Sequence, residues 1–165
     1  MSRIGRLTVG AAIAGLVLAS GFSGLGTAAA GTAATFDVVA AQTPANGELN
    51  FNGADKGRLV ITVPAGAAVQ IMLSNNGTLP HSLQIIPYST KLPASAEPAP
   101  AFPGAVTPNP QIGINKGQKA MIKFTADKPG KYMFICGFPG HALLGMYGVF
   151  EVSPSATAKP SMTKQ

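Results

Sequence analysis

The chain has 165 residues, of which 12 are Lys or Arg and six are Asp or Glu, so its net charge is +6. This length fits one domain, and the lack of a basic motif interleaved with aromatic residues argues against nucleic acid as a partner. There are two histidines and a single cysteine. An internal disulfide is therefore excluded, and Cys136 is a free thiol, half of an intermolecular bridge or a metal ligand.

The first 30 residues have the pattern of a secretory signal. Two arginines precede an apolar run from 7 to 20, and Ala28-x-Ala30 offers a cleavage site. We therefore expect an exported, periplasmic or otherwise extracytoplasmic protein with 1–30 removed. A retained membrane anchor is the alternative, although Gly and Ala dilute the apolar run toward its end. Cleavage would leave 10 basic and six acidic residues, a net charge of +4.

Beyond this segment, the pattern predicts short strands and no amphipathic helix. Residues 31–47 begin as a small-residue tether and include a first strand at 35–40. Further extended segments are expected where β-branched or alternating apolar residues are bounded by Gly, Pro or Asn. They are 48–52, 58–63, 69–74, 79–86, 111–114, 119–125, 131–136 and 146–152. Together they predict an all-β sandwich.

The stretch from Pro87 to Pro110 differs in composition, because it holds seven of the 14 prolines. Proline lacks an amide N–H and restricts φ, so a regular strand does not persist at this density. We expect a Pro-rich loop insertion running over the surface, with one short helical turn near Ser95. The domain is expected to span 48–153, followed by a disordered polar tail at 154–165.

The C-terminal region places three metal donors at regular spacing. Cys136, His141 and Met146 are each separated by four residues, in a Gly- and Pro-containing loop between two predicted strands. Such residues permit tight turns that bring donors toward one ion. The other histidine, His81, lies at the start of a predicted strand. One thiolate, two imidazoles and a thioether are the donors of a trigonal copper site with a weak axial Met.

Other interpretations of these residues remain open. Zinc would accept the cysteine and both histidines, but it gains little from a thioether and usually recruits a fourth Cys, His or carboxylate. Taken singly, a buried cysteine is usually a small inert hydrophobe. The combination favours a metal site, and the four donors together favour copper. An apolar shell around them should raise the reduction potential. Its expected members are Phe134, Phe138, Leu143, Leu144 and Tyr147.

Several motifs are similar to those of the cupredoxins, and more specifically to those of the sulfocyanins, relatives of rusticyanin. The resemblance covers about residues 48–152. The segments that carry it are Phe51-Asn-Gly53, Val63-Pro-Ala-Gly66, Leu79-Pro-His81-Ser-Leu83, Gly130-x-Tyr132-x-Phe134-x-Cys136 and Cys136-Gly-Phe-Pro-Gly-His141 followed by Met146.

The resemblance implies a Greek-key β-sandwich holding one type 1 copper ion. Carried over by position, His81, Cys136 and His141 would be equatorial ligands, and Met146 the axial ligand. Tyr132 would take the place of a tyrosine that braces the metal loop. The family implies an exported, often membrane-associated electron carrier of respiratory chains. It would dock briefly near His141 with a redox partner such as a cytochrome or terminal oxidase.

We therefore expect a mononuclear type 1 copper electron-transfer protein rather than an enzyme. Oxidase or nitrite reductase chemistry needs further copper ions and more histidines than the two present, which leaves only an accessory domain of an oxidase complex. The other alternative is a storage or resistance protein without a redox role. Such proteins favour Met- or His-rich tracts, whereas Met72, Met121 and Met133 are spread along strands as expected core residues. A hydrolase built on Cys136 lacks a supporting partner pattern.

Overall fold

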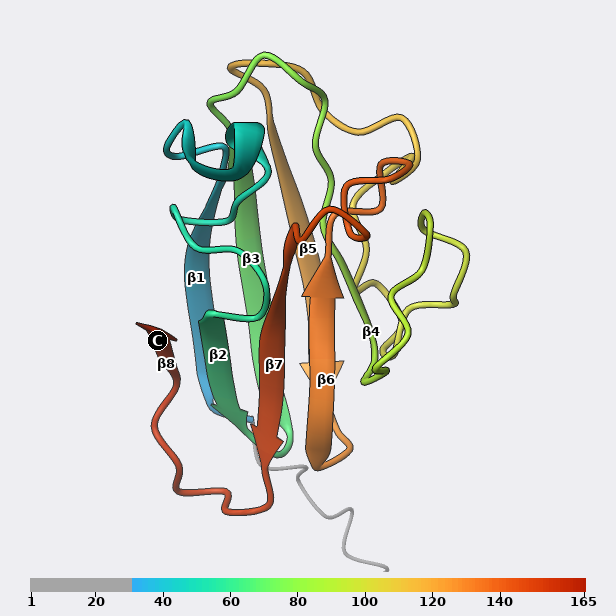
Figure 1. Ribbon diagram of the computed structural model, residues 1–165. Helices are drawn as coiled ribbons and strands as arrows, with labels where there is room; N and C mark the ends of the chain where they lie inside the picture. Colours follow the sequence, from blue (N-terminus) through green and yellow to red (C-terminus); the bar gives the residue numbers. More distant parts are fainter. Residues whose placement is uncertain (1–30) are drawn as a thin grey trace, which may run out of the picture.

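The computed structural model describes residues 31–165, so the expected signal segment at 1–30 lies outside the described residues. Two sheets pack face to face (Figure 1), with strand orders β1-β3-β5 and β4-β6-β7-β2-β8. The expected all-β sandwich is confirmed. The elements are β1 (Ala33–Ala40), η1 (a 3-10 turn, Ala45–Glu48), β2 (Leu59–Pro64), β3 (Ala67–Asn75), β4 (Gln84–Pro87), β5 (Lys119–Ala126), β6 (Gly130–Ile135), β7 (Tyr147–Ser153) and β8 (Ser161–Lys164).

Alternating apolar residues determine which face of the three-stranded sheet lies inside. Successive side chains of a strand point to opposite faces, and β1, β3 and β5 all alternate between buried and more exposed positions. The register places Phe36 beside Ile71 and Ile71 beside Ile122. These three side chains pack with Ile61 and Phe150 of the other sheet in one core cluster.

The Pro-rich segment is irregular, as expected, but it is more than a surface excursion. Phe102 is fully buried, and its ring lies 5.4 Å from that of Phe124 and 4.8 Å from that of Tyr132. The Ala101 amide donates to the Ile85 carbonyl at 2.8 Å, so the segment also covers the edge of β4. The helical turn expected near Ser95 is absent from this part of the structure.

The prediction of a disordered tail at 154–165 is wrong, because these residues contain β8. This strand runs antiparallel to β2, with Met162 opposite Ile61, and Met162 packs against the core. Its four residues carry one apolar side chain, too little for the sequence to predict a strand. The free edge of β2 supplies the missing hydrogen bonds. Since β1 and β8 are both sheet strands, the domain extends beyond the expected limits of 48 and 153.

Other local expectations also differ from the structure. Segments 48–52 and 111–114 make only isolated bridges. Tight turns and the side-chain amides of Asn46 and Asn75, which donate to the carbonyls of Leu49 and Ile114, satisfy part of their backbone instead. The strand expected from 79 begins only at Gln84. Met133 is buried as expected, but Met121 is 44% exposed on the outer face of β5.

From residue 31 onward, no helix has the length and apolar character needed to cross a membrane.

Candidate metal centre

The strand pair β6–β7 determines where Cys136 and Met146 lie. Its last paired residues are Ile135 and Tyr147, and the Cys136 amide donates to the Met146 carbonyl at 3.0 Å. The connecting loop folds back at one end of the sandwich (Figure 1), where the Met146 amide donates to the His141 carbonyl at 2.9 Å. Gly140 has φ +82°, a left-handed conformation that favours glycine. This turn places His141 over the strand ends.

His81 comes from the β3–β4 connection, and its backbone is held on both sides. It exchanges hydrogen bonds with Ile114 at 3.1 and 2.7 Å. The Asn75 side-chain amide donates to the carbonyls of Leu79 and Ile114, both at 2.8 Å. Gly113 permits this close approach, since a Cβ there would lie 2.8 Å from the His81 carbonyl oxygen. The His81 ring is therefore fixed although it lies on a loop.

The structure brings three of the four predicted ligands around one point. Cys136 Sγ lies 3.4 Å from His141 Nδ1 and 3.9 Å from His81 Nδ1, and the three donor atoms lie within 4.8 Å of one another. Metal bonds of about 2.3 Å to sulfur and 2.0 Å to nitrogen, at 120°, would separate these donors by roughly 3.7 Å. The observed spacing fits a trigonal ion. Met146 is also fully buried, at the end of the same loop.

Burial keeps the donors uncharged when no cation is present. It lowers the pKa of His81 to about 4, and the positive charge of His141 contributes to this lowering. Burial also lowers the pKa of His141 and raises the pKa of the Cys136 thiol. A neutral imidazole is the form that binds metal, and a cation stabilises a buried thiolate. The site is therefore suited to a positive ion.

Ser82 joins three segments around the cysteine. Its amide donates to Cys136 Sγ at 3.4 Å, and its hydroxyl accepts from the Gly137 amide at 2.9 Å. The same hydroxyl donates to the Pro110 carbonyl at 2.7 Å. Hydrogen bonds to a ligand atom orient it and tune the metal. Sequence reasoning missed Ser82, for which the one available signal was its position directly after His81.

The apolar shell is narrower than predicted. Phe134 is buried, and the Phe138 ring lies 4.6 Å from that of His141. Leu143 and Leu144, in contrast, are 54% and 60% exposed, because the turn that buries His141 carries the following residues to the outside. The expected role of Tyr132 is also wrong. Its hydroxyl donates to the Lys128 carbonyl at 2.9 Å and therefore braces the turn before β6.

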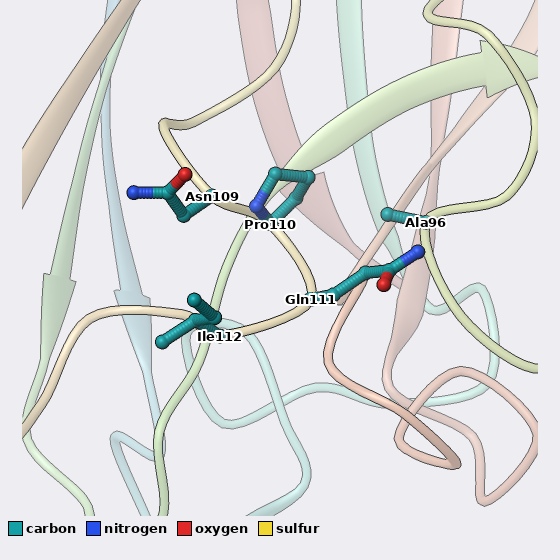
Figure 2. Close-up of a pocket in the computed structure, with 5 residues that line it drawn as sticks. All are labelled: Ala96, Asn109, Pro110, Gln111 and Ile112. Carbon is teal, nitrogen blue, oxygen red and sulfur yellow. The ribbon is translucent and has the colours of Figure 1, made fainter.

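A pocket of about 280 Å³ lies next to the cysteine end of the loop, and the metal donors do not line it (Figure 2). Ala96 faces it from the Pro-rich insertion, Asn109 and Pro110 from the end of that insertion, and Gln111 and Ile112 from the residues that follow it. A Cβ on Gly137 would lie 2.6 Å from Ala96 Cβ and 3.2 Å from Pro110 Cβ. The pocket wall thus packs directly on the residue after Cys136.

Comparison with known proteins identifies the family of this chain. The family described as the sulfocyanin (SoxE) domain matches residues 27–163. The chain belongs to the sulfocyanin family. Sulfocyanin from Sulfolobus acidocaldarius is 38% identical over 117 residues, which are 67% of this chain and 59% of that protein. The chain thus matches about three fifths of the length of this longer relative.

Solved cupredoxin structures share the fold of this family member. Reduced auracyanin from Roseiflexus castenholzii has a TM-score of 0.55 and 24% identity, over 75% of this chain and all of that one. Reduced rusticyanin has a TM-score of 0.52 and 24% identity, over 74% of this chain and 81% of that one.

The expected cofactor, one type 1 copper ion, is confirmed at the level of the family. The residues present fit it, because the three clustered donors are one thiolate and two imidazoles.

Proposed function

We propose that this protein carries single electrons outside the cytoplasm, with His81, Cys136 and His141 as equatorial copper ligands and Met146 as the axial ligand. The observation that carries the proposal is the buried triangle of donors, with Cys136 Sγ at 3.4 and 3.9 Å from the two imidazole nitrogens. The bound copper supplies one-electron oxidation and reduction.

The protein contributes a ligand geometry that need not change between oxidation states. Hydrogen bonds to Ile114 hold the His81 backbone, and those to Met146 and Ser82 hold Cys136. Burial of all three donor side chains excludes water. Because these contacts are made by the protein's own backbone and side chains, little rearrangement accompanies electron transfer.

We infer that electrons pass through the His141 edge. Its side chain is 6% exposed, whereas His81, Cys136 and Met146 are fully buried. Two exposed apolar side chains lie nearby in the chain. Leu143 follows His141 in the loop, and Ile112 lies two residues before Ile114, which pairs with His81. Such an apolar surface suits brief docking, since transient redox complexes bury little area. The partner in this proposal is a cytochrome or terminal oxidase of a respiratory chain. Membrane association through residues 1–30 belongs to the alternative in which that segment is retained rather than cleaved.

Visible and electron paramagnetic resonance spectra after addition of Cu(II) test the proposal. We expect an intense charge-transfer band and narrow hyperfine splitting, the signature of a trigonal site with one cysteine and two histidines. A storage protein would hold copper without this band. A colourless protein that binds zinc, or no metal, would overturn the proposal.

Met146→Leu should retain copper and raise the reduction potential. Leucine removes a weak axial donor that favours Cu(II), so the equilibrium moves toward Cu(I). A change on the order of tenfold in the equilibrium constant between Cu(II) and Cu(I) corresponds to about 59 mV in the one-electron reduction potential. Redox titration measures it, with Met133→Leu as the matched control because Met133 is a buried methionine of β6 outside the loop. A lower potential in Met146→Leu would contradict the axial assignment.

A further inference from the structure

The buried ring of His81 has one polar atom without a hydrogen-bond partner among residues 31–165. This atom is Nε2, and the side chain is fully buried. The other ring nitrogen, Nδ1, faces Cys136 Sγ at 3.9 Å. Metal-binding histidines usually direct their second N–H to a carboxylate, a carbonyl or water, which fixes the tautomer and tunes the metal. The group that faces Nε2 therefore bears on the metal centre.

Glu48 presents a carboxylate to this side of the ring. Its Oε2 accepts hydrogen bonds from the amide and hydroxyl of Thr78, at 2.7 and 2.9 Å. A Cβ placed on Gly77 would lie 2.9 Å from Glu48 Oε2 and 3.4 Å from His81 Nε2. These two atoms are therefore at most 6.3 Å apart, the sum of those distances. Glycine at 77 leaves the space between them free of a side chain.

The backbone that carries Glu48 adopts an unusual conformation. Asn46, Gly47 and Glu48 have φ values of 53°, 63° and 70°; asparagine and glycine adopt positive φ readily, whereas glutamate seldom does. The Asn46 side-chain amide donates to the Leu144 carbonyl of the metal loop at 2.9 Å. Turn η1 is therefore bound both to the metal loop and, through Thr78, to the segment that carries His81. Such costly conformations persist where surrounding contacts hold them and concentrate at functional sites.

We propose that Glu48 is a positioning residue for the metal centre: its negative charge, within 6.3 Å of His81 Nε2, favours a proton on that nitrogen and lowers the reduction potential. The proposal rests on the proposed function, because it takes His81 as a ligand through Nδ1. A proton held on Nε2 leaves Nδ1 free for the ion. A nearby negative charge stabilises Cu(II) more than Cu(I) and so opposes the effect of the apolar shell.

The charge of Glu48 is itself stabilised by the protein. The hydrogen bonds from Thr78 lower the pKa of the Glu48 carboxyl, with the backbone amide as the largest cause. Lys56 is the cation placed against the metal loop, where a Cβ on Gly145 would meet its side chain at 2.9 Å. A basic side chain therefore packs against the metal loop, and an acidic one lies beside the segment that carries His81.

Glu48→Gln tests the proposal in the copper-loaded protein, because glutamine keeps an acceptor for Thr78 and removes the charge. We expect the charge-transfer band to remain and the copper equilibrium to move about two- to fivefold toward Cu(I). Glu151→Gln is the matched control. Glu151 lies on β7, four residues beyond Tyr147 and roughly 13 Å further from the loop. An equal shift in both variants, or none in Glu48→Gln, would overturn the proposal.

Two further measurements separate charge and orientation from packing. Glu48→Asp keeps the charge, so its potential should stay closer to wild type than that of Glu48→Gln. In the metal-free protein, nuclear magnetic resonance should show a slowly exchanging His81 Nε2 proton that changes in Glu48→Gln and not in Glu151→Gln. An unchanged proton signal would contradict the orienting role. Absence of the blue band from wild-type protein would instead refute the proposed function.

Discussion

Replacing Cys136 with serine is expected to abolish the visible charge-transfer band and tight copper binding. A serine hydroxyl does not ionise in the range where a thiolate forms, and it lacks the soft sulfur that copper prefers. The side chain is fully buried between two imidazoles and the Ser82 amide, and the sulfur of Met146 is a thioether that cannot supply a thiolate in its place. Absorption spectra and copper content after dialysis measure the effect.

The control for Cys136→Ser is the metal-free wild-type protein. Serine has nearly the shape of cysteine, so the two metal-free proteins should show similar circular dichroism spectra. Blue absorbance that persists in the variant would refute the assignment of Cys136 as a ligand. If the variant lost its fold as well as the band, the melting temperature of wild-type protein with and without copper would still test for a metal site in the folded domain.

Copper is expected to raise the melting temperature substantially. His81 and Cys136 lie 55 residues apart in the chain, so the donor triangle exists only in the folded protein. A ligand that binds only the folded state at 1,000 times its Kd stabilises it by about 4 kcal/mol. For a domain of this size, that corresponds to a rise on the order of 10 °C.

Differential scanning calorimetry with and without copper measures this stabilisation. The Cys136→Ser variant should show little or no rise, because it lacks the thiolate that the site requires. Equal melting temperatures for the wild-type protein with and without copper would count against a metal site in the folded domain.

Much of the sandwich could be predicted from local patterns. The alternation of apolar residues in 69–74 and 119–125 appears in the structure as alternating burial along β3 and β5. Such periodicity is local information, because a strand turns alternate side chains to opposite faces whichever strand it pairs with. β8 has no such pattern and depends on the free edge of β2.

The burial of Phe102 in the core could not be predicted from the sequence either. A Pro-rich segment predicts irregular backbone, but not which side chain turns inward. Here the ring packs between Phe124 and Tyr132 because the segment crosses the edge of β4. Long-range packing of this kind depends on how two distant segments are arranged in space.

The sequence by itself predicted the donor triangle, because one cysteine and two histidines allow a single combination. The spacing of Cys136, His141 and Met146 also indicated a loop between paired strands. The tertiary structure alone decided the separations of the donors, the contacts of Ser82 and the approach of Glu48 to His81. These depend on strand register and on the positive φ of Glu48, neither of which a local pattern of residue types specifies.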